Sequence, residues 1–135
     1  YELTGDIKYA RMGGLAASWF FGNNAAGFPM YDPQTGRGYD GLISETQVNY
    51  NAGAESTIEA LHTILEAEQV PEARRWLDVR ADPPVRINRC GSDYFYRIFR
   101  SASGTPGAAG VVMNLTRETL NVLVDEELDE FVNGR

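Results

Sequence analysis

One stretch decides the fold of the N-terminal half, Asn49-Tyr50-Asn51-Ala52-Gly53-Ala54-Glu55-Ser56-Thr57. Asn51 or Gly53 is suited to cap a helix that begins near residue 52, since both residue types are favoured at the N-cap. Glu55 then lies in the first turn, where the helix dipole favours an ionised carboxylate. Such a group acts as a base, a nucleophile or a hydroxyl acceptor rather than as a proton donor. The stretch predicts either a ligand site at a helix N-terminus or a plain cap.

The helix that follows is predicted over residues 52–69. Its apolar face is expected to carry Ala54, Ile58, Leu61, Ile64 and Leu65, and its polar face Glu55, Glu59, His62 and Glu66. Glu59 and His62 have the Glu-x-x-His spacing of carboxylate-bridged metal sites. A second such pair is missing because His62 is the only histidine of the chain. We therefore expect a solvent-facing stripe and no metal.

An earlier helix is predicted over residues 6–21, with Thr4 or Asp6 as its cap. Gly13 and Gly14 inside it cost about 1 kcal/mol each relative to alanine. We expect a neighbouring helix to pack closely against them.

Residues 23–51 form a long connection that is too rich in aromatic residues for a disordered linker. Asp32-Pro33-Gln34-Thr35-Gly36 predicts a turn, so Met30-Tyr31 is expected to pair with Gly38-Tyr39 in a short hairpin. The same connection places Asp32, Arg37 and Asp40 beside Tyr31 and Tyr39. Carboxylates and guanidinium groups bind sugar hydroxyls, and aromatic faces cover sugar C–H surfaces. Each aspartate also occupies an ordinary turn position, which is the structural alternative.

Pro83-Pro84 marks the predicted boundary between a domain of residues 1–82 and an appendage of residues 83–135. Strands are expected over 85–89, 93–99 and 111–115. Thr116 is expected to cap a final helix with Leu120, Leu123, Val124, Leu128 and Phe131 facing inward. Its acidic residues 125–130 would then lie toward its C-terminus, against the helix dipole.

Composition excludes several classes of protein. The chain has 135 residues, 43% of them apolar, and a net charge of −7. This acidic balance argues against a nucleic-acid partner, and the longest apolar run is too short for a membrane span. We expect a cytoplasmic protein without metal or organic cofactor.

Three motifs resemble a known architecture. They are Trp19-Phe20-Phe21-Gly22-Asn23-Asn24, the segment Phe28-Pro29-Met30-Tyr31-Asp32-Pro33 with Thr35 to Gly41, and Asn49 to Thr57. In order and spacing they are similar to the closing helices of bacterial (α/α) six-hairpin toroid domains, which occur in glycosidase-like and glycosyltransferase-associated proteins. The resemblance covers about residues 6–77. A toroid needs about six helical hairpins, so it implies a fragment or a missing N-terminal domain.

The resemblance implies N-terminal hairpins of the (α/α)-toroid type. Together with the strands and final helix predicted after residue 83, this gives an expected α+β chain in which the hairpins are followed by a small three-stranded sheet and a C-terminal helix. It also implies a carbohydrate-active protein with a saccharide ligand held by the 23–55 wall. Glycoside hydrolysis and glycosyl transfer are the reactions to consider, and the sequence does not decide whether the chain is an enzyme. The expected catalytic residues are Glu55, Asp40 and Asp32, and the expected ligand-binding residues are Asn49, Asn51, Tyr31, Tyr39, Arg37 and Trp19.

The alternative is a non-catalytic interaction or structural module that acts as a subunit of an oligomer, most simply a homo-oligomer. The strands between residues 85 and 115 and the acidic final helix would then bind the partner.

Overall fold

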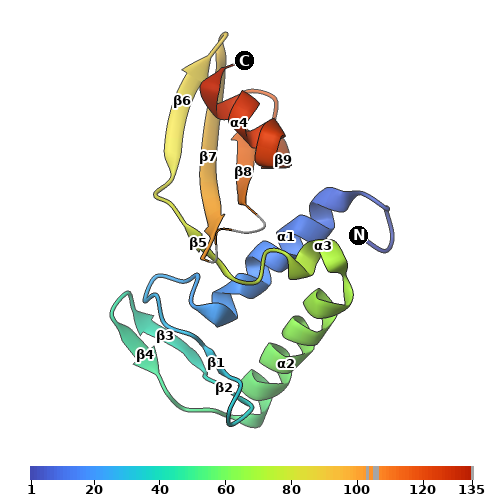
Figure 1. The fold of residues 1–135 in the computed structure, drawn as a ribbon. Coiled ribbons are helices and arrows are strands. Elements are labelled where there is room, and N and C mark those ends of the chain that lie inside the picture. Colours follow the sequence, from blue (N-terminus) through green and yellow to red (C-terminus); the bar gives the residue numbers. More distant parts are fainter. Residues whose placement is uncertain (103, 105–106, 135) are drawn as a thin grey trace. The chain divides into compact units, whose positions relative to one another are not determined.

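The computed structural model describes residues 1–102, 104 and 107–134. The chain divides into two compact units, Tyr1–Asp78 and Val79–Arg135, each with its own elements (Figure 1). The predicted boundary between domains 1–82 and 83–135 stays a prediction. No helix among the described residues is both long enough and apolar enough to cross a membrane.

The first unit begins with helix α1, Ile7–Ala17. Asp6 caps it, and its carboxylate accepts a hydrogen bond from the backbone N–H of Lys8 at 3.0 Å. The chain then tightens into the 3-10 helix η1, Ser18–Phe21, which ends at Gly22 in a left-handed conformation (φ 100°). The predicted helix over 6–21 is therefore an α-helix whose last turn is a 3-10 helix.

Gly14 allows α1 to pack closely against a neighbouring helix. A Cβ added to Gly14 would lie 2.8 Å from the carbonyl carbon of Ala73 and closer still to its oxygen, whereas a Cβ on Gly13 would meet nothing within 4 Å. Ala73 belongs to helix α3, Pro71–Arg74, which packs against α1. The expectation of close packing is confirmed for Gly14 and is wrong for Gly13.

Two short hairpins occupy the long connection. Strands β1, Tyr31–Asp32, and β2, Arg37–Gly38, pair antiparallel with Tyr31 opposite Gly38. The backbone N–H of Tyr39 also donates to the carbonyl of Met30 at 2.9 Å. This predicted hairpin is confirmed. The second, β3 (Gly41–Ser44) with β4 (Gln47–Asn49), was not predicted.

Helix α2, Ala54–Gln69, connects the hairpins to α3. Ala60, Ile64 and Ala67 are its buried residues. Ile58 and Leu65 were predicted to face inward, but they are 61% and 54% exposed. The buried face of α2 is therefore narrower than predicted, and two of its three buried residues are alanines. The core of the unit combines Ala17, Ala67, Ala73 and Leu77 with the partly buried Phe21 and Val70.

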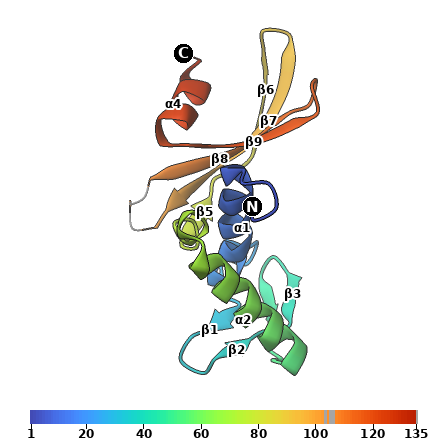
Figure 2. The same ribbon diagram turned by 90° about the vertical axis from the view of Figure 1, so that its right-hand side faces the viewer.

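The described residues of the second unit form a five-stranded antiparallel sheet with one helix, α4. Figures 1 and 2 show this unit from two sides. Its long strand β7, Ser92–Ser101, pairs with β8, Ala108–Asn114, on one side. On the other side β7 pairs with both β5, Val79–Ala81, and β6, Val85–Arg89. Strand β9, Thr119–Val124, pairs with β8 at the opposite edge.

Helix α4, Asp125–Asn133, packs on β8 and β9. The Phe131 ring meets the rings of Tyr94 and Tyr96 at centroid distances of 5.4 and 5.5 Å. A Cβ on Gly110 would meet the side chain of Leu128. Asp125, Glu126 and Glu127 occupy the first turn of α4, where the helix dipole favours acidic residues. The acidic residues were predicted to lie toward the C-terminus of the final helix, and this is wrong for these three because the helix begins at Asp125.

The predicted architecture is wrong in two respects. The chain is a mixed α+β fold in which α1, α2 and α3 form no toroid, and its sheet has five strands rather than three. Residues 119–124 were assigned to the final helix because Leu120, Leu123 and Val124 fit a helical period. Tertiary pairing with β8 decided otherwise, since an apolar run this short is compatible with either period.

The turn before β9 shows why the expected helix cap was wrong. The carboxamide oxygen of Asn114 accepts hydrogen bonds from the N–H groups of Thr116 and Arg117 at 3.1 and 3.0 Å. The Thr116 hydroxyl itself accepts from the N–H of Asp93 at 2.9 Å. Thr116 therefore closes a turn instead of starting a helix.

Candidate functional site

The first unit contains a cavity of about 730 Å³ at the N-terminus of α2. Aromatic side chains come from η1 and from the end of the first hairpin, and acidic side chains come from the hairpin and from α2. The lining residues are Trp19, Phe20, Tyr39, Asp40, Gly53, Ala54, Glu55, Ser56 and Glu59. Its size is within the range of about 300 to 1,000 Å³ that is usual for small-molecule sites.

Asp40 ties the hairpin to the start of α2. Its backbone N–H donates to the carbonyl of Asn51 at 2.8 Å. Its carboxylate oxygen Oδ1 accepts from the Ser56 hydroxyl at 2.5 Å and from the Gly53 N–H at 3.3 Å. Gly53 is the N-cap residue but has no side chain for the purpose, so Asp40 supplies the capping oxygen from 13 residues away. Asp40 is therefore held in place by the fold.

Gly38 brings the hairpin close enough for this bond. A Cβ on Gly38 would lie 2.6 Å from the Ser56 carbonyl oxygen and 2.8 Å from the Cβ of Ala60. The Gly38 N–H also donates to the Thr57 hydroxyl at 3.3 Å. The backbone of β2 thus packs directly on the first turns of α2.

Glu55 and Glu59 line the same cavity one helical turn apart. Both residues are exposed, and among the described residues no hydrogen bond or ion pair involves either carboxylate. Side chains four residues apart lie on one face of a helix. The two carboxylates are therefore available to accept hydrogen bonds from a ligand.

The aromatic side of the cavity is built from packed rings. Trp19 and Phe20 meet edge to face at 5.2 Å. Tyr39 meets Tyr50 at 5.5 Å and Phe28 at 6.3 Å, so its ring is held by two neighbours. These contacts orient Trp19 and Tyr39 where they line the cavity.

The structure brings together Trp19, Tyr39, Asp40 and Glu55 of the predicted site residues. The other predicted residues do not line this cavity. Asp32 bonds within its own turn, where its carboxylate accepts from the Thr35 hydroxyl at 2.7 Å and the Gln34 N–H at 2.9 Å. These two hydrogen bonds, the Thr35 one first, hold the pKa of Asp32 below its ordinary value.

The remaining predicted residues are placed by the backbone. Tyr31 and Arg37 belong to the β1–β2 hairpin. The Asn49 carboxamide accepts from the Asn51 N–H at 3.1 Å, and the Asn51 carbonyl accepts from Asp40. The two asparagines therefore shape the chain that leads into α2.

Phe20, Ser56 and Glu59 line the cavity but were not predicted as site residues. Glu59 was assigned to the solvent-facing stripe, although its four-residue spacing from Glu55 places both on one face. That spacing could have identified Glu59 as a second carboxylate of the site. For Ser56 no signal existed, because its role depends on the distant Asp40.

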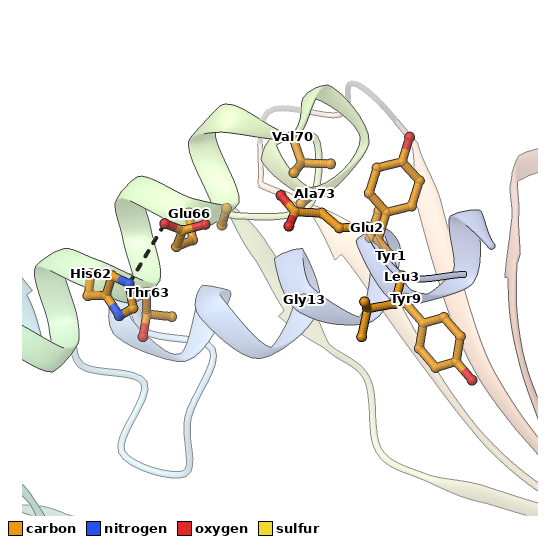
Figure 3. Close-up of a pocket in the computed structure, with 12 residues that line it drawn as sticks. Tyr1, Glu2, Leu3, Tyr9, Gly13, His62, Thr63, Glu66, Val70 and Ala73 are labelled. Carbon is orange, nitrogen blue, oxygen red and sulfur yellow. Dashed lines mark ion pairs between the residues drawn. The ribbon is translucent and has the colours of Figure 1, made fainter. Parts of the chain in front are cut away.

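A second hollow, of about 540 Å³, lies between α1, α2 and α3 in the same unit (Figure 3). Figure 3 shows His62 and Glu66 of α2, whose side chains pair at 3.7 Å, and the rings of Tyr1 and Tyr9. Its lining is mainly apolar and includes none of the predicted site residues. It also contains two tyrosine rings, of Tyr1 and Tyr9, and two carboxylates, of Glu2 and Glu66, but the Glu66 carboxylate already pairs with His62. The larger cavity is therefore the candidate site, because it contains four of the predicted residues.

Metal binding has no preformed site in the part of the chain that the structure describes, since no group of three or more His, Cys, Asp or Glu residues there is arranged to hold an ion. Asp40, Glu55 and Glu59 of the larger cavity are therefore not arranged to hold a metal ion together.

Comparison with known proteins gives no assignment. No protein-family model matches the chain, and no curated protein matches it. The resemblance to toroid domains therefore has no support from a family, in agreement with the fold.

Proposed function

We propose that the first unit binds a saccharide in the cavity at the N-terminus of α2. One observation carries the proposal: Trp19 and Tyr39 share a single cavity with Asp40, Glu55 and Glu59. Saccharides present C–H faces that aromatic rings cover and hydroxyl groups that carboxylates accept. An apolar pocket without acids, or an acidic surface without rings, would satisfy only one of these needs.

The lining residues have different roles in the proposed binding. Trp19 and Tyr39 cover the sugar ring, while Glu55 and Glu59 accept hydrogen bonds from its hydroxyls. Asp40 is a positioning residue, because its Oδ1 already holds Ser56 and Gly53. The Gly53 N–H at the start of α2 already donates to Asp40. The N–H groups of the first turn after it have no partner within the helix and would donate to the ligand.

Hydrolysis is a narrower proposal than binding. Glycoside hydrolysis needs two carboxyl groups that flank the scissile bond. Glu55 and Glu59 lie on one helix and therefore on one wall, and Asp40 is occupied by the helix cap. The arrangement favours binding, with Glu55 as the residue best suited to a base or nucleophile should the chain act on its ligand.

Saturation-transfer NMR against a panel of neutral and charged oligosaccharides tests the proposal. We expect binding to the wild-type chain, at least tenfold weaker binding to Trp19→Ala and Glu55→Gln, and unchanged binding to Glu66→Gln, which alters the second hollow. A circular-dichroism spectrum of each variant checks that α2 is retained. Binding of every sugar unaffected by Glu55→Gln and Trp19→Ala would remove this cavity as the site.

The second candidate is a non-catalytic interaction module that acts as a subunit of an oligomer. The exposure of Ile58 and Leu65 on α2, 61% and 54%, favours it, because exposed apolar side chains on one helix face often contact a partner. Light scattering with Leu65→Glu tests it. A dimer that this substitution dissociates supports the module, whereas a monomer at every concentration refutes self-association.

A further inference from the structure

The charge of the larger cavity narrows the class of its ligand. Asp40, Glu55 and Glu59 give its lining three acidic side chains and no basic one. Arg37, the basic residue predicted to bind ligand, belongs to β2 and is not part of the lining. A saccharide in this cavity therefore meets carboxylates without a neighbouring cation.

One positive contribution opposes this charge. The N-terminus of α2 carries the equivalent of about +0.5 elementary charge. The Asp40 carboxylate accepts from Ser56 and Gly53 at that terminus and compensates it. Glu55 and Glu59 then remain as uncompensated charges, because no described residue pairs with either carboxylate. These two charges make the electrostatic potential inside the cavity negative.

We propose that this cavity selects saccharides that carry an ammonium group, that is, 2-amino-2-deoxy sugars of the glucosamine type, and rejects uronic, sulfated and phosphorylated sugars. The inference rests on the proposed function, since it takes the ligand to be a saccharide. Trp19 and Tyr39 would cover the ring while Glu55 and Glu59 hold the ammonium group. A carboxylate makes charge-assisted hydrogen bonds with hydroxyl and ammonium groups alike, and an ammonium group adds the attraction between opposite charges.

The experiment is a calorimetric titration with three tetrasaccharides of matched length: glucosamine, N-acetylglucosamine and galacturonate oligomers. At an ionic strength of roughly 0.02 M we expect the glucosamine oligomer to bind about tenfold more tightly than its acetylated counterpart, and the galacturonate oligomer not to bind measurably. The advantage should shrink several-fold at roughly 0.3 M salt, because screening weakens exposed charge pairs. Tetralysine measures attraction to the acidic chain without a sugar ring, and we expect it to bind more weakly than the glucosamine oligomer.

Charge-neutral variants locate the effect. Glu59→Gln should reduce the preference for the amino sugar to about threefold or less, because the amino sugar loses an ion pair and the acetylated sugar loses only hydrogen bonds to the same carboxylate. Glu68→Gln is the matched control, because Glu68 is an exposed acid of α2 outside the cavity lining, and it should keep the full preference.

The outcomes separate the two proposals. Equal affinity for the glucosamine and N-acetylglucosamine oligomers, or tighter binding of galacturonate, overturns the selectivity and leaves saccharide binding intact. Tetralysine binding as tightly as the glucosamine oligomer overturns it as well, because charge alone would then explain the preference. Absence of binding by all three sugars overturns both.

Discussion

The packing inside the first unit differs from the packing inside the second. In the first, backbone meets backbone or small side chain: Gly14 lies against Ala73, and Gly38 lies against Ser56. In the second, strands pair along a regular ladder, and α4 packs through large side chains such as Phe131 and Leu128. Packed side-chain ends can shift to absorb an added atom, but a backbone carbonyl cannot. The first unit should therefore be the more sensitive of the two to single methyl groups, and it is the unit that contains the candidate site.

Gly14→Ala is the strongest test of this contrast. The new Cβ would overlap the carbonyl of Ala73, so α1 and α3 must separate. We expect the free energy of unfolding to fall by about 3 kcal/mol or more, the upper range for overpacking. Urea denaturation measures it. Gly13→Ala is the matched control, since its Cβ meets nothing within 4 Å and helix propensity should stabilise it by up to about 1 kcal/mol. Equal effects at the two glycines would contradict the contrast.

Gly38→Ala and Gly110→Ala compare the units directly. At Gly38 the Cβ meets the Ser56 carbonyl and the Ala60 Cβ, so we expect a loss of about 2 kcal/mol and weaker sugar binding as the hairpin moves Asp40. At Gly110 it meets the end of the Leu128 side chain, which can change rotamer, so the loss should be less than about 1 kcal/mol. Thermal unfolding of both variants, with calorimetric titration for Gly38→Ala, gives the comparison. A larger loss at Gly110 would reverse it.

The ion pairs of the two units also differ, because one in the first unit is largely buried and one in the second is exposed. Glu72 accepts from Arg11 at 2.9 Å and pairs with Arg75 at 3.2 Å, and the side chains of Arg11 and Glu72 are only 16% and 17% exposed. Burial opposes ionisation of Glu72, but the hydrogen bonds from Arg11 and Arg75 outweigh it and hold its pKa below the ordinary value of 4.5. In the second unit, Arg100 and Asp82 pair at 2.9 Å with side chains 61% and 42% exposed.

Glu72→Gln should therefore cost about 1 to 2 kcal/mol at pH 7, and Asp82→Asn less than about 1 kcal/mol. Because the pKa of Glu72 is lowered by folding, its contribution is complete above pH 4.5 and is lost as the pH falls through the lowered pKa. Urea titrations between pH 7 and pH 2.5 measure this, and the wild-type and Glu72→Gln curves should converge at the acidic end. A difference that persists there would assign the effect to packing rather than charge.

The sequence predicted what depends on neighbours along the chain. The turn Asp32 to Gly36 bonds within itself, so the β1–β2 hairpin could be predicted from it. The capping of α2 by Asp40 could not, because it joins residues 13 and 16 positions apart through a bond that no pattern encodes. Strand β9 was missed for a related reason: the pairing of Thr119 to Val124 with β8, and not their own period, decides their conformation.

The candidate site itself should reduce the stability of the first unit by a small amount. Glu55 and Glu59 are like charges at positions i and i+4 of α2, a pairing that destabilises a helix by about 0.2 to 0.5 kcal/mol. Glu59→Gln should therefore stabilise the unit by that amount at low salt, while it weakens binding of an amino sugar. The gain should disappear at high salt, because screening removes the repulsion. Differential scanning calorimetry at two ionic strengths measures it, with the binding titration run on the same samples. A variant that is both less stable and weaker in binding would show that Glu59 supports the fold, whereas the predicted opposite signs would mark a residue retained for its ligand.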